Sequence, residues 1–270
     1  MSRFTDREYL TTDQYKNADN LNARIQIHRK FSTNPYGWYN WVFDTLAQLP
    51  ANARILELGC GSAEMWVNIA GRIPESWDIT LSDLSPGMLD AAWRNVVVTG
   101  RSFKFEQIDA QSIPHEDESF DVVIANHMLH HVSDRPQALS EIKRVLKAGG
   151  HLIATTIGDI HMKEMNGWLA RATDNRQTGM FSLTFTLENG REQMLQFFSH
   201  IETMRYEDDL RVTEVEPIMA YIRSATRAPE LSEGELVNLE KELASSLEAA
   251  GEIFITKDSG LFQAIKQENS

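Results

Sequence analysis

The sequence predicts an α/β fold, a doubly wound and mostly parallel sheet with helices on both faces. Between residues 54 and 157, short apolar runs alternate with segments of helical periodicity, the pattern of strands joined by crossover helices. The run Phe120–Asn126 is almost continuously apolar, as expected of a strand covered on both sides. A glycine turn follows the first strand, at the place where open sheets of this kind bind ligands.

The first predicted strand, Arg54–Leu58, runs directly into Gly-Cys-Gly at residues 59–61. Glycine has no Cβ, so the backbone can bend sharply there and a ligand can lie against it. The dinucleotide-binding pattern requires a third glycine, but Glu64 stands in its place and would repel a pyrophosphate. No phosphate-binding loop of the G-x-x-x-x-G-K-S/T type occurs in the sequence. Glu57 also suits a cationic ligand better than a polyphosphate.

Two further strands are predicted at Asp78–Asp83 and Phe103–Ile108. Asp83 lies about twenty residues beyond the glycines, the spacing at which a carboxylate accepts hydrogen bonds from the two hydroxyls of a ribose. The other interpretation is that Asp83 caps the next helix, although Ser85 fits that cap better. Asp109, which follows the third strand, is by itself typical of a turn.

The fourth strand, Phe120–Asn126, leads into a segment with three histidines. The first of them, His127, follows the carboxyl end of the strand and is expected to point into the ligand crevice. A helix over Pro136–Lys147 carries apolar residues at core spacing and ends at a Gly-Gly pair. The fifth strand covers His151–Ile157.

The flanking segments are predicted to be largely helical. Ahead of the first strand, helices are expected over Tyr15–Phe31 and Trp38–Leu49. After the fifth strand, the pattern predicts helices over residues 161–176, Glu188–Phe198, Pro217–Ser224 and Ser232–Ala250, a strand over His200–Tyr206, and a hairpin over Ile253–Lys266 that turns at Asp258–Gly260. The predicted divisions are an N-terminal helical lid (1–50), a ligand-binding core (51–207), a helical cap insertion (208–252) and a C-terminal strand that completes the core sheet (253–270).

Charge and composition disfavour several classes of partner. The net charge of −13 argues against nucleic acid, because basic surfaces drive binding to phosphate backbones. No apolar run reaches the length of a membrane helix, so no membrane partner is expected. No signal peptide is visible and the single cysteine, Cys60, cannot form an internal disulfide, which together favour a cytoplasmic location. No feature of the sequence predicts an oligomeric state.

Four motifs between residues 54 and 157 together resemble the class I S-adenosylmethionine-dependent methyltransferases, of the type 11 domain that acts on small molecules. The first motif of that family, E-x-G-x-G-x-G, is matched by Glu57, Gly59, Gly61 and Ala63, with alanine in place of the last glycine. The segments Ser82–Leu89, Asp109-Ala110 and Lys147–Gly150 follow in the family's order, and Ala148 stands where proline is usual. The resemblance implies a Rossmann-like sheet of seven strands whose last strand is antiparallel.

The same resemblance implies S-adenosyl-L-methionine as the cofactor and S-adenosyl-L-homocysteine as its product. Asp83 would hold the ribose, and Leu84 and Met88 would flank the adenine. Asp109 and Ala110 would bond to the edge of the adenine ring. The implied cofactor contacts are Glu57, Gly59, Cys60, Gly61, Asp83, Leu84, Met88, Asp109, Ala110, Asn126 and His127.

Methyl transfer needs mainly position and a dry cavity, and it needs a base only if the acceptor must lose a proton. His127 is the favoured candidate for that base and His131 the second; the alternative is that both imidazoles satisfy local backbone groups. The two have the spacing of metal ligands on a helix, but no third ligand accompanies them, so no metal is predicted. Tyr15, His28 and Phe31 are the predicted lid and substrate contacts.

The predicted function is the transfer of a methyl group from S-adenosylmethionine to a small molecule. Three alternatives stay open: an enzyme of the same fold that binds this cofactor but catalyses another reaction such as cyclisation or decarboxylation, a NAD-dependent dehydrogenase, and a non-catalytic binding subunit. Oxygen, nitrogen and carbon acceptors all occur on this fold. The apolar lid favours a largely hydrophobic or aromatic acceptor.

Overall fold

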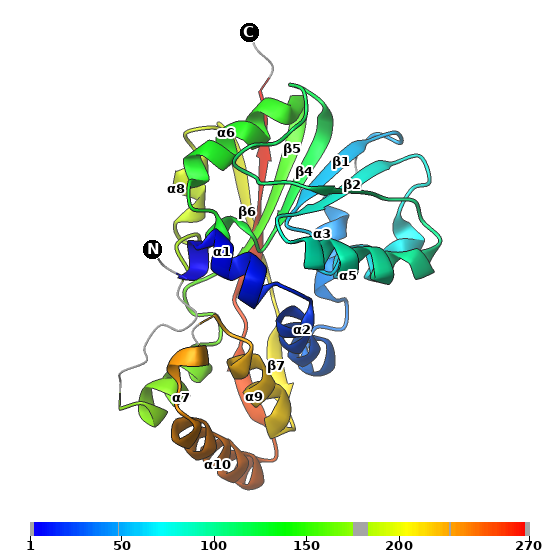
Figure 1. The fold of residues 1–270 in the computed structure, drawn as a ribbon. Coiled ribbons are helices and arrows are strands. Elements are labelled where there is room, and N and C mark those ends of the chain that lie inside the picture. Colours follow the sequence, from blue (N-terminus) through cyan, green and yellow to red (C-terminus); the bar gives the residue numbers. More distant parts are fainter. Residues whose placement is uncertain (1–2, 48, 175–182, 227, 268–270) are drawn as a thin grey trace.

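The structure, a computed structural model, describes residues 3–47, 49–174, 183–226 and 228–267. At its centre is a seven-stranded sheet in the order β3-β2-β1-β4-β5-β9-β6 (Figure 1). Its strands are β1 Arg54–Leu58, β2 Asp78–Asp83, β3 Lys104–Gln107, β4 Phe120–Asn126, β5 Leu146–Ile157, β6 His200–Tyr206 and β9 Ser259–Ile265. The pairs among β1 to β5 are parallel, whereas β9 is antiparallel to both β5 and β6. The predicted fold class is confirmed.

Helices cover both faces of this sheet (Figure 1). The α-helices are α1 Arg7–Tyr9, α2 Asp19–Phe31, α3 Trp38–Asp44, α4 Glu64–Asn68, α5 Pro86–Val96, α6 Arg135–Val145, α7 Lys163–Ala172, α8 Gly190–Met194, α9 Val215–Arg223 and α10 Glu233–Ala250. Short 3₁₀ helices are η1 Arg3–Thr5, η3 Ala70–Arg72, η4 Val97–Thr99, η5 Leu129–His131 and η6 Ala228–Glu230, and η2 Leu10–Gln14 is a π-helix. One face packs against α6 and α8, and the other against α3, α4 and α5. In β4, Val123 and Ala125 face the first core and Val122 and Ile124 the second, because successive side chains of a strand point to opposite faces. This two-sided burial explains the continuous apolar run in the sequence.

A second, smaller unit, here called the cap, lies below the core sheet in Figure 1. It consists of α7, α9, α10 and a two-stranded antiparallel sheet formed by β7 (Asp209–Val212) and β8 (Ile253–Thr256). Its core contains buried residues of these five elements together with Ile27 and Phe31 of α2. Helix α2 therefore precedes the core in sequence but packs with the cap. No helix of the described residues has the length and apolar character needed to cross a bilayer.

The predicted C-terminal hairpin is wrong. Only Lys257 and Asp258 separate β8 from β9, yet β8 pairs with β7 in the cap and β9 pairs with β5 and β6 in the core. The chain passes from the cap to the core at Lys257 and Asp258, and the segment after β5 stabilises this connection. The Gly158 N–H donates to the Asp258 carbonyl (2.9 Å), and the Asp258 N–H donates to His161 Nδ1 (3.1 Å). Alternation along a segment predicts a strand, but its partner depends on contacts far away in sequence. The strand β7 was likewise not expected inside the predicted helical insertion.

Several helix ends also differ from the predictions. Helix α2 begins at Asp19 rather than near residue 15, and α3 and α8 are shorter than expected. The helix expected over residues 161–176 is α7, and residues 175 and 176 lie outside the described part of the chain. Helix α10 begins as predicted, because the Ser232 hydroxyl accepts the Glu235 N–H while the Glu235 carboxylate accepts the Ser232 N–H.

Candidate functional site

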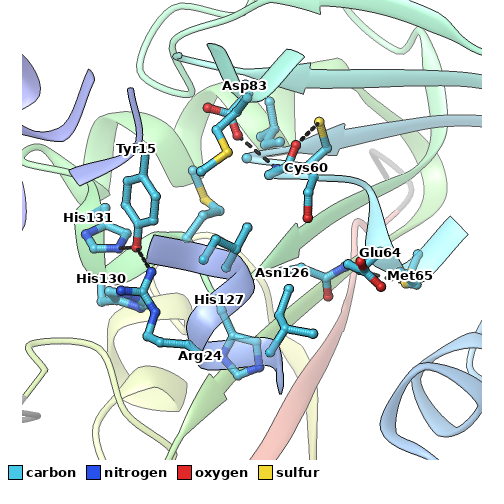
Figure 2. Close-up of a pocket in the computed structure, with 18 of the residues that line it drawn as sticks. Tyr15, Arg24, Cys60, Glu64, Met65, Asp83, Asn126, His127, His130 and His131 are labelled. Carbon is cyan, nitrogen blue, oxygen red and sulfur yellow. Dashed lines mark hydrogen bonds between the residues drawn. The ribbon is translucent and has the colours of Figure 1, made fainter. Parts of the chain in front are cut away.

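A cavity of about 690 Å³ lies between the strand tips of the core, the N-terminal segment and the cap, and its volume is within the range of small-molecule sites, roughly 300–1,000 Å³. Figure 2 shows part of its wall, where side chains from the strand tips and from the N-terminal segment surround one space. The predicted residues that line it are Tyr15, His28, Glu57, Gly59, Cys60, Gly61, Asp83, Leu84, Met88, Asp109, Ala110, Asn126, His127 and His131. Phe31, expected as a lid contact, packs instead in the core of the cap, because it lies on the face of α2 that meets the cap.

The turn after β1 requires glycine at two positions. Gly59 and Gly61 both have a positive φ, +66° and +54°. A Cβ on Gly59 would lie 2.8 Å from the Cβ of Met128, and a Cβ on Gly61 would lie 2.8 Å from Leu21 Cδ2 of α2. Cys60 between them is buried, and burial raises the pKa of its thiol well above the usual value. The thiol therefore stays protonated and unreactive.

Asp83 at the end of β2 joins this turn to the next helix. Its Oδ2 accepts the Gly61 N–H (3.0 Å) and its Oδ1 accepts the Ser85 N–H (2.9 Å). Burial raises the pKa of Asp83 to about 6. The predicted cap of α5 is provided by Ser85, whose hydroxyl accepts the Met88 N–H. The Leu84 N–H also acts on this carboxylate, so three of its roughly four acceptor sites are used and it retains capacity for a ligand hydroxyl.

Glu57 is almost completely buried behind the turn. Its carboxylate accepts hydrogen bonds from Trp66 Nε1 (2.5 Å) and Asn126 Nδ2 (2.7 Å). Burial, only partly offset by these two donors, raises its pKa to about 7. The sequence did not identify Trp66 as a partner of this acid, because the residue has no motif and reaches Glu57 only through the packing of α4 against β1. Glu57 therefore positions Asn126 in the cavity wall.

The N-terminal segment closes the cavity over Asp109. Arg7 of α1 forms an ion pair with Asp109 (3.0 Å), whose carboxylate also accepts the Gln111 N–H. The Ser85 hydroxyl donates to the carbonyl of Tyr15 (2.7 Å). No motif in the sequence identifies Arg7, because its contact with Asp109 joins residues about a hundred positions apart.

His127 and His131 occupy different environments rather than one helical face. His127 has a left-handed backbone (φ +47°), and its N–H donates to the hydroxyl of Thr155 (2.9 Å). Its ring lies 5.4 Å from that of Trp38. Burial and the nearby Lys257 ammonium lower its pKa to about 4. Among the described residues, no group of three or more possible ligands could hold a metal ion.

His131 is part of a hydrogen-bonded chain with Tyr15 and Arg24 (Figure 2). Its Nε2 lies 2.9 Å from the Tyr15 hydroxyl and its Nδ1 lies 2.9 Å from the carbonyl of Phe4. A carbonyl only accepts, so Nδ1 of the neutral ring carries the proton and Nε2 accepts from Tyr15. Arg24 also donates to the Tyr15 hydroxyl (3.1 Å). Burial lowers the pKa of His131 to about 4.

Comparisons with known proteins agree with the motifs. A family model described as "Methyltransferase domain" matches residues 56–154. The ubiquinone/menaquinone biosynthesis C-methyltransferase UbiE of Xanthomonas oryzae pv. oryzae is 34% identical over 143 residues, 52% of this chain and 53% of that protein. The demethylmenaquinone methyltransferase of Deinococcus radiodurans is 34% identical over 110 residues, 41% and 44% of the two chains. The chain thus spans about half the length of these curated relatives.

Solved structures share the fold over most of the chain. Phosphoethanolamine N-methyltransferase 2 of Haemonchus contortus, in complex with S-adenosyl-L-methionine, superposes with a TM-score of 0.59 at 19% identity, covering 99% of this chain and 61% of that one. The 4+2 cyclase SpnF superposes with a TM-score of 0.61 at 19% identity, covering 97% of each chain. At such identities the likeness establishes the fold and not the reaction. Over residues 56–154, which lie within that fold, the chain therefore matches the model of a methyltransferase domain.

Proposed function

We propose that this protein is an S-adenosylmethionine-dependent methyltransferase that acts on a small molecule. The observation that carries the proposal is the convergence of four strand tips on one cavity. These tips contribute the glycine turn after β1, Asp83 of β2, Asp109 after β3, and Asn126 with His127 at the end of β4. The carboxyl ends of parallel strands meet at one edge of the sheet, which is where ligands of such sheets bind.

The residues at this edge fit the cofactor. Gly59 and Gly61 line the cavity, and the Asp83 carboxylate retains acceptor capacity for a ribose hydroxyl. Leu84 and Met88 add apolar surface beside it for the adenine. When bound, S-adenosylmethionine supplies a methyl group on a sulfonium, from which a neutral thioether leaves.

The proton chemistry is assigned to Tyr15 and His131 rather than to His127. The Phe4 carbonyl fixes the tautomer of His131, so its Nε2 can take the Tyr15 proton as the Tyr15 oxygen takes one from the acceptor, while Arg24 donates to that oxygen. The pair can thus remove a proton from an acceptor that must lose one. His127 instead packs against Trp38 and holds the corner after β4. Residues of the N-terminal segment line the cavity, and such a cover limits the access of water to the reacting groups.

The acceptor is a small molecule. The curated relatives carry names of methyltransferases of quinone biosynthesis, and the cavity walls include apolar side chains such as Leu10, Leu21, Ile25 and Met65. Both facts support an acceptor with a substantial apolar part.

Calorimetric titration with S-adenosylhomocysteine tests the assignment. Wild type should bind, and Asp83→Ala should weaken binding by tenfold or more, because hydrogen bonds to a charged group contribute about 1.5–3 kcal/mol. Asp90→Ala, which changes an exposed carboxylate of α5, is the control. Absence of binding to wild type, or equal affinity of the two variants, contradicts the site. Formation of S-adenosylhomocysteine in the presence of an acceptor separates methyl transfer from cyclisation on the same fold.

A further inference from the structure

Basic and imidazole side chains lie together at one end of the cavity, and none of them contacts the cofactor in the proposed function. We call it the basic end and define it by Arg24, His28, His161 and Lys257, all of which line the cavity. Arg24 and His28 are four residues apart on α2 and therefore share a face. Lys257 and His161 come from the two chain segments that join core and cap. Figure 2 shows Arg24 well separated from Asp83 across the cavity.

His28 is the centre of this cluster. Burial lowers the pKa of His28 well below the usual value, and the nearby Lys257, His161 and Arg24 lower it further. Its ring lies 6.2 Å from that of His161 and 6.0 Å from that of Tyr221. Its Nδ1 is buried and has no hydrogen-bond partner among the described residues. A buried polar nitrogen without a partner is costly, and a ligand atom would satisfy it.

Arg24 forms no ion pair with a carboxylate of the described residues. It donates to the carbonyl of Ser224 (2.7 Å) and to the Tyr15 hydroxyl, and no carboxylate of the described residues is within ion-pair distance of it. The other two arginines of the cavity wall differ in this respect, since Arg7 pairs with Asp109 and Arg29 with Glu64. Arg24 therefore adds a net positive charge to this end of the cavity, in a chain whose net charge is −13.

Lys257 lines the cavity close to His28. It pairs with Asp208 and donates to Ser32 Oγ (3.2 Å), and its side chain is only 6% exposed. Asp208 is not part of the wall, and its carboxylate also accepts the backbone N–H groups of Thr33 and Asn34. An ammonium has three donors, and two are used, so the third is available to a ligand. His161, whose pKa burial lowers to about 3, stays neutral and adds no charge.

We propose that the basic end binds the oxyanion of the methyl acceptor, which makes the acceptor a small molecule with an apolar body and one acidic head, a carboxylate or a phosphate. Arg24 and Lys257 supply the donors, and His28 completes the contact. The apolar residues of the remaining wall accommodate the body of the molecule. The identification of this ligand as the acceptor rests on the proposed function, whereas the anion preference of the cavity does not.

Binding of three probes of similar shape tests the proposal, with the full chain saturated with S-adenosylhomocysteine. 2-Naphthoate or 2-naphthyl phosphate should bind at least tenfold more tightly than 2-naphthamide, because a charge-assisted hydrogen bond contributes about 1.5–3 kcal/mol. The tighter of the two anions identifies the acidic head. Equal binding of all three probes overturns the proposal.

Single and double variants test which residues cause the preference for anionic probes. Arg24→Gln should remove most of it, while Arg29→Gln, the same change on the same helix, should retain it. Because Lys257→Gln leaves Asp208 buried without its cation, it is combined with Asp208→Asn, and this double variant should also lose the preference. If Arg24→Gln weakens S-adenosylhomocysteine but not the naphthyl anions, Arg24 serves the cofactor and the proposal is wrong.

The same titrations, repeated without S-adenosylhomocysteine, separate the two proposals. An anion preference in the cofactor-free protein, together with no binding of S-adenosylhomocysteine, contradicts the proposed function and leaves the anion site standing. Binding of S-adenosylhomocysteine without any anion preference contradicts the anion site alone.

Discussion

Burial displaces the pKa values of several ionisable side chains in the cavity wall. It raises the pKa of Glu57 to about 7 and that of Asp83 to about 6, and it lowers those of His127 and His131 to about 4. At neutral pH both imidazoles are therefore uncharged, and Glu57 is only partly ionised. A cluster of displaced pKa values in a cavity is typical of a functional site.

Glu57 should make the protein less stable as pH rises. Its pKa is raised from 4.5 when unfolded to about 7 when folded, so between these values the folded state holds a proton that the unfolded state has lost. The stabilisation is complete below pH 4.5 and is lost as pH rises to about 7, a change of roughly 3 kcal/mol. Urea unfolding of wild type and Glu57→Gln across this range should show wild type losing that amount relative to the variant. Parallel stability curves would contradict the prediction.

Tyr15→Phe should slow methyl transfer without abolishing cofactor binding. The change removes the hydroxyl that bonds His131 and Arg24, and general-base assistance contributes about 10²–10⁴-fold to a rate. We expect a loss of that size in the rate of S-adenosylhomocysteine formation with an acceptor that loses a proton. Tyr36→Phe, which removes an exposed hydroxyl bonded to Asp44, serves as control. A wild-type rate in Tyr15→Phe would show that this hydroxyl has no part in the reaction.

At the scale of elements, the turn between β1 and α4 tolerates side chains poorly at two of its positions. Its two glycines combine a positive φ with close neighbours, Met128 from the β4 corner and Leu21 from α2. The turn therefore fixes how closely two other elements approach the strand tips, and its geometry sets the shape of the cavity at the proposed cofactor end.

Gly59→Ala should destabilise the fold more than Gly100→Ala. Both positions have a positive φ, so both variants lose about 1–2 kcal/mol from the left-handed backbone. Only the new Cβ at residue 59 meets Met128, at 2.8 Å, whereas nothing lies within 4 Å at Gly100. Chemical denaturation should resolve the difference, and only Gly59→Ala should lose affinity for S-adenosylhomocysteine. Equal losses would mean that Met128 moves aside freely.

At the scale of the whole molecule, the cavity is assembled from three parts that are distant in sequence. The core contributes the strand tips, and the cap contributes Tyr221. The N-terminal segment contributes lining residues between Phe4 and Tyr39. Contacts such as Arg7 with Asp109 hold that segment against the core. We propose that this segment acts as a lid, so that ligands enter before it closes.

Ligand binding should therefore protect the N-terminal segment. In hydrogen–deuterium exchange, amides of residues 3–31 should exchange more slowly with S-adenosylhomocysteine bound, because the ligand stabilises the closed state by about 2.7 kcal/mol at a hundredfold excess over Kd. Amides of α10, which lies outside the cavity wall, should be unaffected. Protection limited to the strand tips would mean that the segment does not close on the ligand.

The sequence by itself predicted the first six strands of the core sheet and the motifs at its strand tips, but it paired the last strand wrongly. These patterns depend on residues close together in the sequence. Apolar runs such as Phe120–Asn126 predict burial, and the glycines of the turn predict an unusual backbone conformation. The capping box of α10 was predictable for the same reason, because its two hydrogen bonds join residues three apart.

Only the tertiary structure decided which distant residues share the cavity. In the structure β8 and β9 belong to different sheets, and Phe31 packs in the core of the cap. Arg24, His161 and Lys257 lie together at the basic end. None of these residues lies in a motif, and their partners are far away in the sequence. Pairing and charge clustering depend on packing between elements, which local periodicity does not encode.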